Sequence, residues 1–89
     1  MEKNKILIDR IMKIAREYGA NKLVLFGSFW ENPENANDID IACDIPGLGL
    51  LSFAGKLESL LRMNVDVIPL EPENSFTDYI YKTGKTIYV

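Results

Sequence analysis

The sequence contains no histidine, a single cysteine and no long apolar run. The lack of histidine excludes imidazole catalysis and any zinc site built on histidine. The lone Cys43 excludes an internal disulfide, and we expect it to be a buried core thiol in a reducing compartment. No segment approaches the roughly 20 apolar residues of a membrane span, and the charged start does not resemble a signal peptide. We therefore expect a cytoplasmic protein with no membrane partner.

Positive charge is also scarce. Ten Lys and Arg stand against thirteen Asp and Glu, which gives a net charge of −3. Proteins that bind nucleic acid usually present a basic face, because neutralising phosphates supplies most of their affinity. The composition therefore argues against an extended nucleic-acid partner, but it allows a single nucleotide whose charge a metal ion neutralises. The length of 89 residues suits one domain, which we place at 1–89.

Apolar spacing along the chain predicts elements in the order αβ(loop)βαβαβ. Helices are predicted at 5–18, 48–62 and 75–82, strands at 23–26, 38–43, 65–68 and 86–89, and a loop at 29–37. This order predicts an α+β fold, a small mixed β-sheet with helices mainly on one face. In the last helix we expect Ser75 to be the N-cap and Phe76, Tyr79 and Ile80 to point inward.

Three carboxylates interrupt apolar segments that are typical of strands. Asp38 and Asp40 alternate with isoleucines, and Asp66 lies between two valines. An unpaired buried charge costs several kcal/mol, so these acids need a compensating charge. Since alternate side chains of a strand share a face, Asp38 and Asp40 project together, and pairing of the strands can add Asp66. Oxygen ligands of this kind suit Mg²⁺ or Mn²⁺, and two such ions stabilise both oxygens of an in-line displacement.

The Gly27-Ser28 pair directly follows the first predicted strand. Glycine lets the backbone approach a phosphate closely, and the serine hydroxyl can donate to it. Blander interpretations stay open: the pair is a simple turn, and the acids are solvated carboxylates at strand ends. For Asp44, which precedes Ile45-Pro46, we expect a turn role.

Gly27-Ser28, Asp38-Ile39-Asp40 and Val65-Asp66-Val67-Ile68 together resemble the signature of the DNA polymerase beta-like nucleotidyltransferases. The short chain is similar to the minimal nucleotidyltransferase branch, the antitoxin-type proteins. The resemblance implies the nucleotidyltransferase fold, with Asp38, Asp40 and Asp66 as the catalytic residues. They would hold two Mg²⁺, with Mn²⁺ as an alternative, while Gly27 and Ser28 bind the triphosphate.

The resemblance also implies a reaction and a partner. The enzyme would transfer a nucleoside monophosphate, AMP from ATP, to a hydroxyl, with Asp66 polarising that hydroxyl. The implied acceptor is a tyrosine of a helical HEPN-type toxin, which the protein would silence as its antitoxin. The sequence leaves open the acceptor, the nucleotide base and the oligomeric state, and it allows an oligomer.

One segment departs from the family pattern. Where relatives carry an arginine-rich stretch of the form Arg-Ala-Arg-Gly after Gly-Ser, this chain reads Phe29-Trp30-Glu31-Asn32. Without a guanidinium near the triphosphate, we expect reduced activity. Phe29 and Trp30 are interpreted as packing residues or a partner contact, with adenine stacking as the alternative. The rival function is a nucleotidyltransferase-fold protein that neutralises its partner by binding alone.

Overall fold

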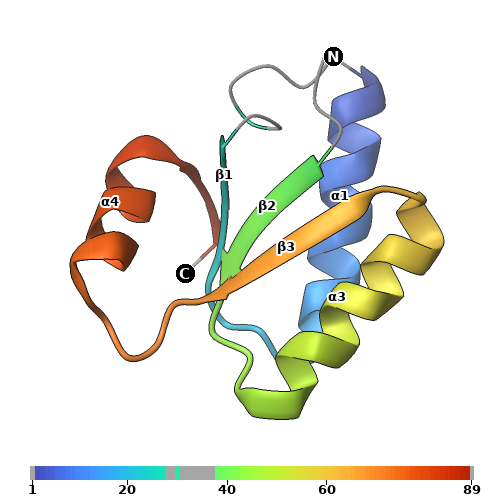
Figure 1. Ribbon diagram of the computed structural model, residues 1–89. Helices are drawn as coiled ribbons and strands as arrows, with labels where there is room; N and C mark the ends of the chain where they lie inside the picture. The colour runs from blue at the N-terminus through green and yellow to red at the C-terminus, as the bar shows by residue number, and fades with distance from the viewer. Residues whose placement is uncertain (1, 28–29, 31–37, 89) are drawn as a thin grey trace.

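The computed structural model describes residues 2–27, 30 and 38–88. Its elements are α1 (Glu2–Glu17), β1 (Leu23–Phe26), β2 (Asp38–Cys43), α3 (Gly47–Leu61), β3 (Asn64–Pro69), α4 (Ser75–Thr83) and β4 (Lys85–Tyr88). Figure 1 shows these elements along the chain. The predicted α+β class and the order of the described elements are confirmed, with element ends shifted by a few residues. Apart from Trp30, the predicted loop at 29–37 lies outside the described residues.

The described strands form a four-stranded sheet in the order β3-β2-β1-β4. β1 is antiparallel to both β2 and β4, whereas β2 and β3 run parallel. The sheet is therefore mixed, as predicted, and the terminal strand β4 lies at an edge. The parallel pair is possible because α3 provides the crossover connection that parallel neighbours require.

The main core lies between the sheet and two helices, α1 and α3, which cover one face (Figure 1). Alternation decides which strand residues enter it: Leu23 and Leu25 of β1 and Ile39, Ile41 and Cys43 of β2 are fully buried there. Burial raises the pKa of the Cys43 thiol to about 11, which confirms it as a core thiol.

α4 covers part of the opposite face. A smaller core on that side contains Val24, Ala42, Leu70 and Ile80, all fully buried. Two of the described helices thus share one face of the sheet and one lies on the other, which agrees with helices mainly on one face. No helix in the described part of the chain is both long and apolar enough to cross a membrane.

The predictions for α4 were wrong in detail. The N-cap is Asn74 rather than Ser75, because the Asn74 side chain accepts hydrogen bonds from the backbone N–H groups of Phe76 and Thr77 at 2.9 and 3.0 Å. Ile80 is buried as expected, but Phe76 and Tyr79 are 48% and 60% exposed. The helix instead buries Thr77, whose hydroxyl is satisfied locally by donating to the Asn74 carbonyl and accepting from its N–H.

Asp44 has the turn role that the sequence predicted. Its Oδ1 accepts hydrogen bonds from the backbone N–H groups of Asn21 and Lys22 at 2.8 and 3.0 Å. The carboxylate thereby ties the end of β2 to the turn that precedes β1. It is a structural group remote from the other strand acids.

Candidate active site

The face of the sheet opposite α1 and α3 carries the strand acids. Ile39 and Ile41 are fully buried on the helix-covered side, so the alternating Asp38 and Asp40 lie on the other side, each half-buried. The predicted common face of these two carboxylates is therefore what the structure has. Their placement follows from the burial of the isoleucines.

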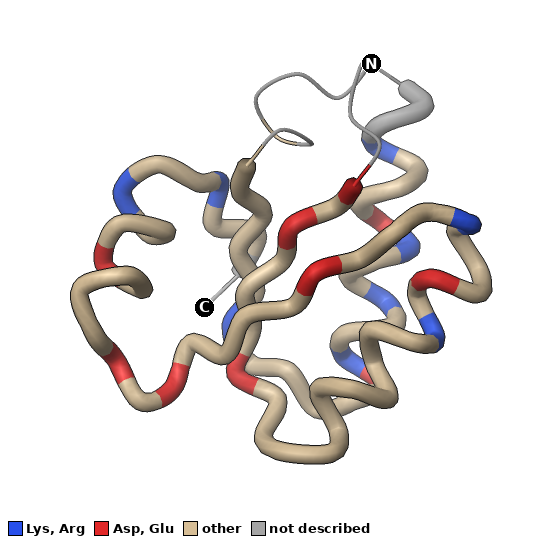
Figure 2. Tube along the Cα trace, viewed as in Figure 1, with Lys and Arg blue, Asp and Glu red and all other residues tan. Residues whose placement is uncertain are grey.

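Asp66 reaches the same face from the neighbouring strand. In the parallel register of β2 and β3, Asp40 is paired with Asp66, and Figure 2 shows acidic positions side by side on these strands. The pKa of Asp40 is raised, first by its burial and then by the negative charges of Asp66 and Asp38. These like charges make it unfavourable for all three carboxyl groups to ionise together, and a bound cation would relieve that repulsion.

Asp38 has a partner that the sequence reasoning missed. The side-chain amide of Asn64 donates a hydrogen bond of 3.2 Å to Oδ1 of Asp38, and the two residues are paired in the β2–β3 register. Asn64 lies two positions before Asp66, so strand alternation alone would have placed it on the acid face. This amide holds Asp38 toward β3.

The side chains of the strand acids do not form a preassembled metal site. Within the described segments, no group of three or more His, Cys, Asp or Glu side chains is arranged to hold a metal. The donor chemistry nevertheless fits Mg²⁺, which binds through one or two carboxylates and completes its shell with water and substrate phosphates. The structure thus places Asp40 and Asp66 together, with Asp38 beside them on the same face.

Gly27 directly follows β1 and lies against Asp40. Its φ of +72° lies in the left-handed region that favours glycine. A Cβ at this position would collide with the Asp40 carboxylate and lie 3.1 Å from its Cγ. Glycine is therefore required here for a reason the sequence did not reveal, the close approach of Asp40. Ser28 and Phe29 lie outside the described residues.

The fold also has a groove that is separate from Asp38, Asp40 and Asp66. A groove of about 350 Å³ lies between α1 and α3, where its lining includes Arg10, Lys13 and Lys56. It is on the helix-covered side of the sheet, so the carboxylates are not part of it. The acids instead occupy the part of the other face that α4 leaves uncovered.

A mixed sheet with facing carboxylates on its parallel pair, beside a glycine turn, defines a nucleotidyltransferase-type domain. The family described as Polymerase beta, Nucleotidyltransferase matches residues 9–89. The chain therefore belongs to this nucleotidyltransferase family. No curated protein sequence matches the chain.

Solved structures extend the comparison. A toxin–antitoxin structure with AMP-PNP is 26% identical and has a TM-score of 0.75, over 90% of this chain and 71% of that chain. A complex of tri-AMPylated Shewanella oneidensis HEPN toxin with MNT antitoxin is 24% identical, with a TM-score of 0.75 over 94% and 71% of the two chains. An MntA–HepT structure is 23% identical, with a TM-score of 0.73 over 94% and 71%.

The two structures that are less than 25% identical to this chain establish the fold alone, and both have the same fold as this chain. Together with the family match, these neighbours confirm the predicted resemblance to the antitoxin-type minimal nucleotidyltransferases and the nucleotidyltransferase fold. The family match supports a nucleotidyltransferase-type enzyme.

Proposed function

We propose that this protein is an antitoxin that transfers AMP from ATP to a tyrosine hydroxyl of a HEPN-type toxin, with Mg²⁺ as its cofactor. The observation that carries the proposal is the pairing of Asp40 with Asp66, on the face opposite α1 and α3 of a nucleotidyltransferase-family sheet. Two neighbours point to the substrates: one structure contains AMP-PNP, and another contains a tri-AMPylated HEPN toxin.

Each residue of the site has a role in this proposal. Asp38, Asp40 and Asp66 would hold the metal, which when bound neutralises phosphate charge and stabilises the attacking and leaving oxygens. Asn64 fixes the Asp38 carboxylate through its 3.2 Å hydrogen bond. Gly27 leaves room for Asp40 and, with Ser28, would receive the triphosphate.

The transfer itself forms one bond and breaks one. The acceptor oxygen bonds to the α-phosphorus while the bond from that phosphorus to the bridging oxygen breaks, and pyrophosphate leaves. The hydroxyl loses its proton, and we assign Asp66, which is exposed on the acid face, as the group that receives it. No histidine is available for this step.

The test is label transfer with the purified chain and a purified HEPN-type toxin as acceptor. We expect the toxin to become labelled when the ATP is radioactive at the α-phosphate, but not when it is radioactive at the γ-phosphate. No labelling is expected when a chelator removes the metal. Asp40→Asn should abolish the label, whereas the matched Asp44→Asn should keep it, because Asp44 serves only the turn. Wild-type labelling by Asp40→Asn would refute the enzymatic proposal.

Neutralisation by binding alone remains the second candidate, and one observation favours it. The Trp30 side chain, in the segment that departs from the family pattern, is 38% exposed. Exposed tryptophans are common anchors of protein interfaces. If the wild-type chain inhibits the toxin without labelling it, and Trp30→Ala abolishes the inhibition, this second function is the correct one.

A further inference from the structure

A row of side chains leads from the acids to an exposed aromatic ring. Asp66 is paired with Asp40 across the parallel strands, and Asp40 is paired with Phe26 across the antiparallel strands. Directly paired residues of neighbouring strands project from the same face, with Cβ atoms about 5 Å apart. The row therefore crosses the sheet from β3 to β1 and changes from charged to apolar along its course.

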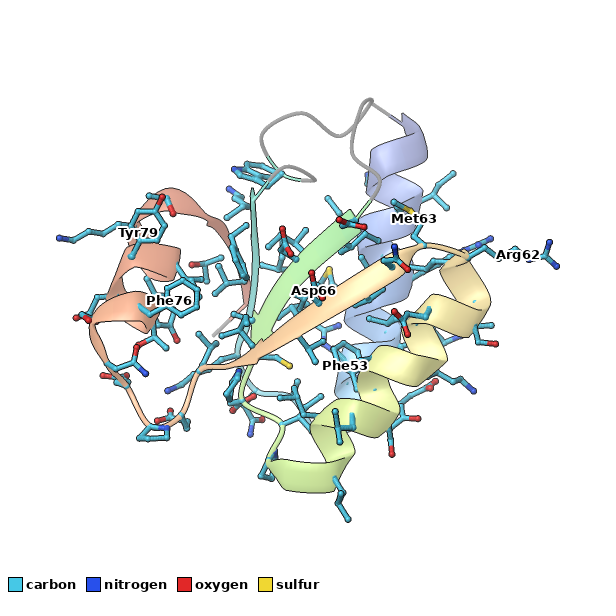
Figure 3. All side chains as sticks on the ribbon, in the orientation of Figure 1. Phe53, Arg62, Met63, Asp66, Phe76 and Tyr79 are labelled. Atoms are coloured by element: carbon cyan, nitrogen blue, oxygen red, sulfur yellow. The ribbon has the colours of Figure 1, made fainter. Side chains whose placement is uncertain are left out.

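Phe76 of α4 continues this row. Its ring lies 6.5 Å from that of Phe26, centroid to centroid, and the ring planes are nearly perpendicular at 89°. In such an edge-to-face pair, at least one face of the Phe76 ring is not covered by Phe26. The side chain is 48% exposed, and Figure 3 shows it projecting from α4 toward the sheet that carries Asp66.

The aromatic pair lies at the margin of the small core under α4. That core consists of Val24, Ala42, Leu70 and Ile80, which are fully buried, and Phe26 packs against it while still partly exposed. Phe76 borders the part of this face that no other described segment covers, next to Phe26, which precedes Gly27. A half-exposed ring at the edge of a charged site is suited to a ligand that is charged at one end and planar and apolar at the other.

We propose that Phe76, supported by Phe26, is the stacking platform for the base of the nucleotide. The inference rests on the proposed function, in which the α-phosphate lies at the carboxylates. In ATP only the ribose separates the α-phosphate from the base. The order along the row, from Asp40 through Phe26 to Phe76, matches the order of the donor from phosphate to base.

The test compares ATP with inorganic tripolyphosphate, which has the phosphates but no base. Calorimetric titration with Mg²⁺ and without the partner protein measures both dissociation constants. Phe76→Ala should weaken ATP about tenfold, which is the scale of one base–aromatic stack, and leave tripolyphosphate unchanged. Phe76→Trp should retain ATP affinity. Phe76→Leu keeps apolar contact with Phe26 without an aromatic face, so it should behave like Phe76→Ala even though its fold is preserved.

Tyr79→Ala is the matched control. Tyr79 lies on the same helix and is 60% exposed, but it makes no ring contact with any side chain in the described part of the chain. Its replacement should change neither constant. Unchanged ATP binding by Phe76→Ala, or an equal loss for tripolyphosphate, overturns the inference. Unchanged ATP binding with weaker toxin labelling also overturns it, because the ring then serves the acceptor.

Failure of the proposed function has a different signature. If the wild-type chain binds neither ligand, the nucleotide site is absent and both proposals fall. If it binds tripolyphosphate as tightly as ATP, the phosphate site stands and only the stacking platform is wrong. If ATP binding depends on Phe76 but no label reaches the toxin, the platform stands and the transfer reaction is wrong.

Discussion

Replacing Asp40 with Asn should make the metal-free protein more stable. Asp40 is half-buried and paired in register with Asp66, and its pKa is raised by burial and by the charges of Asp66 and Asp38. A carboxyl whose pKa is higher in the folded than in the unfolded state contributes stability at low pH that is lost as pH rises through its folded pKa. Near neutral pH, ionised Asp40 therefore works against folding, and Asn removes that effect.

Coulomb's law sets an upper bound on the size of the effect. Two unit charges about 4 Å apart repel by roughly 4 kcal/mol at an effective dielectric constant of 20. Asp66 is exposed and the pair can share a proton, so solvent and protonation remove most of this repulsion. We expect a gain of about 1 kcal/mol in the free energy of unfolding.

The assay is urea unfolding in chelator at several pH values. The gain from Asp40→Asn should be present near pH 7 and should shrink as pH falls through the folded pKa of Asp40. Asp44→Asn is the control with the opposite sign, because the Asp44 carboxylate accepts two backbone hydrogen bonds and its neutralisation should destabilise the fold.

Mn²⁺ provides the second half of the test. It should stabilise the wild type by an amount that follows RT ln(1 + [L]/Kd) and should stabilise Asp40→Asn much less. If Asp40→Asn is less stable than the wild type in chelator, and Mn²⁺ shifts both proteins equally, the acids are structural and the shared metal site is wrong.

Three further substitutions or reactions test the local structure. Gly27→Ala should destabilise the fold more than Gly19→Ala. Both positions have a positive φ, which costs an alanine about 1–2 kcal/mol, but only a Cβ at Gly27 would also collide with Asp40. Removing the Asp40 carboxylate should therefore restore part of the stability lost in Gly27→Ala. Asn74→Ala should cost about 1 kcal/mol in urea unfolding through loss of the cap of α4; an unchanged midpoint would refute the cap. Cys43 should resist iodoacetamide at pH 8 until the protein is unfolded, because burial raises its pKa to about 11; rapid labelling of the native protein would contradict this.

The placement of Asp38 and Asp40 was predictable because local physics decides it. Ile39 and Ile41 must be buried, and a strand has only two faces, so the acids between them go to the other face. The strand positions were also predictable, because the apolar runs are short, although β3 and β4 each begin one residue earlier than predicted. Neither step needs knowledge of the partner strands.

The partners of these residues were not predictable, because they depend on register between distant segments. Alternation allows Asp66 to face either Asp38 or Asp40, and packing of α3 and β3 on the main core selects Asp40. The same holds for α4, where aromatic size suggested an inward Phe76. The capping box between Asn74 and Thr77 instead orients the helix so that Thr77 is buried, and the Phe76 ring lies at the border of the site, half-exposed.

Because β2 is a central strand, we expect the site to depend most on Asp40. Its strand is the only described one with an antiparallel neighbour on one side and a parallel neighbour on the other. Asp40 therefore meets Phe26 from β1 and Asp66 from β3, and Gly27 has no side chain where the Asp40 carboxylate approaches. The glycine turn, the second acid and the aromatic row all adjoin this one carboxylate. A change at Asp38 or Asp66 should remove one carboxylate of the site, whereas a change at Asp40 should also alter the surroundings of Gly27 and Phe26.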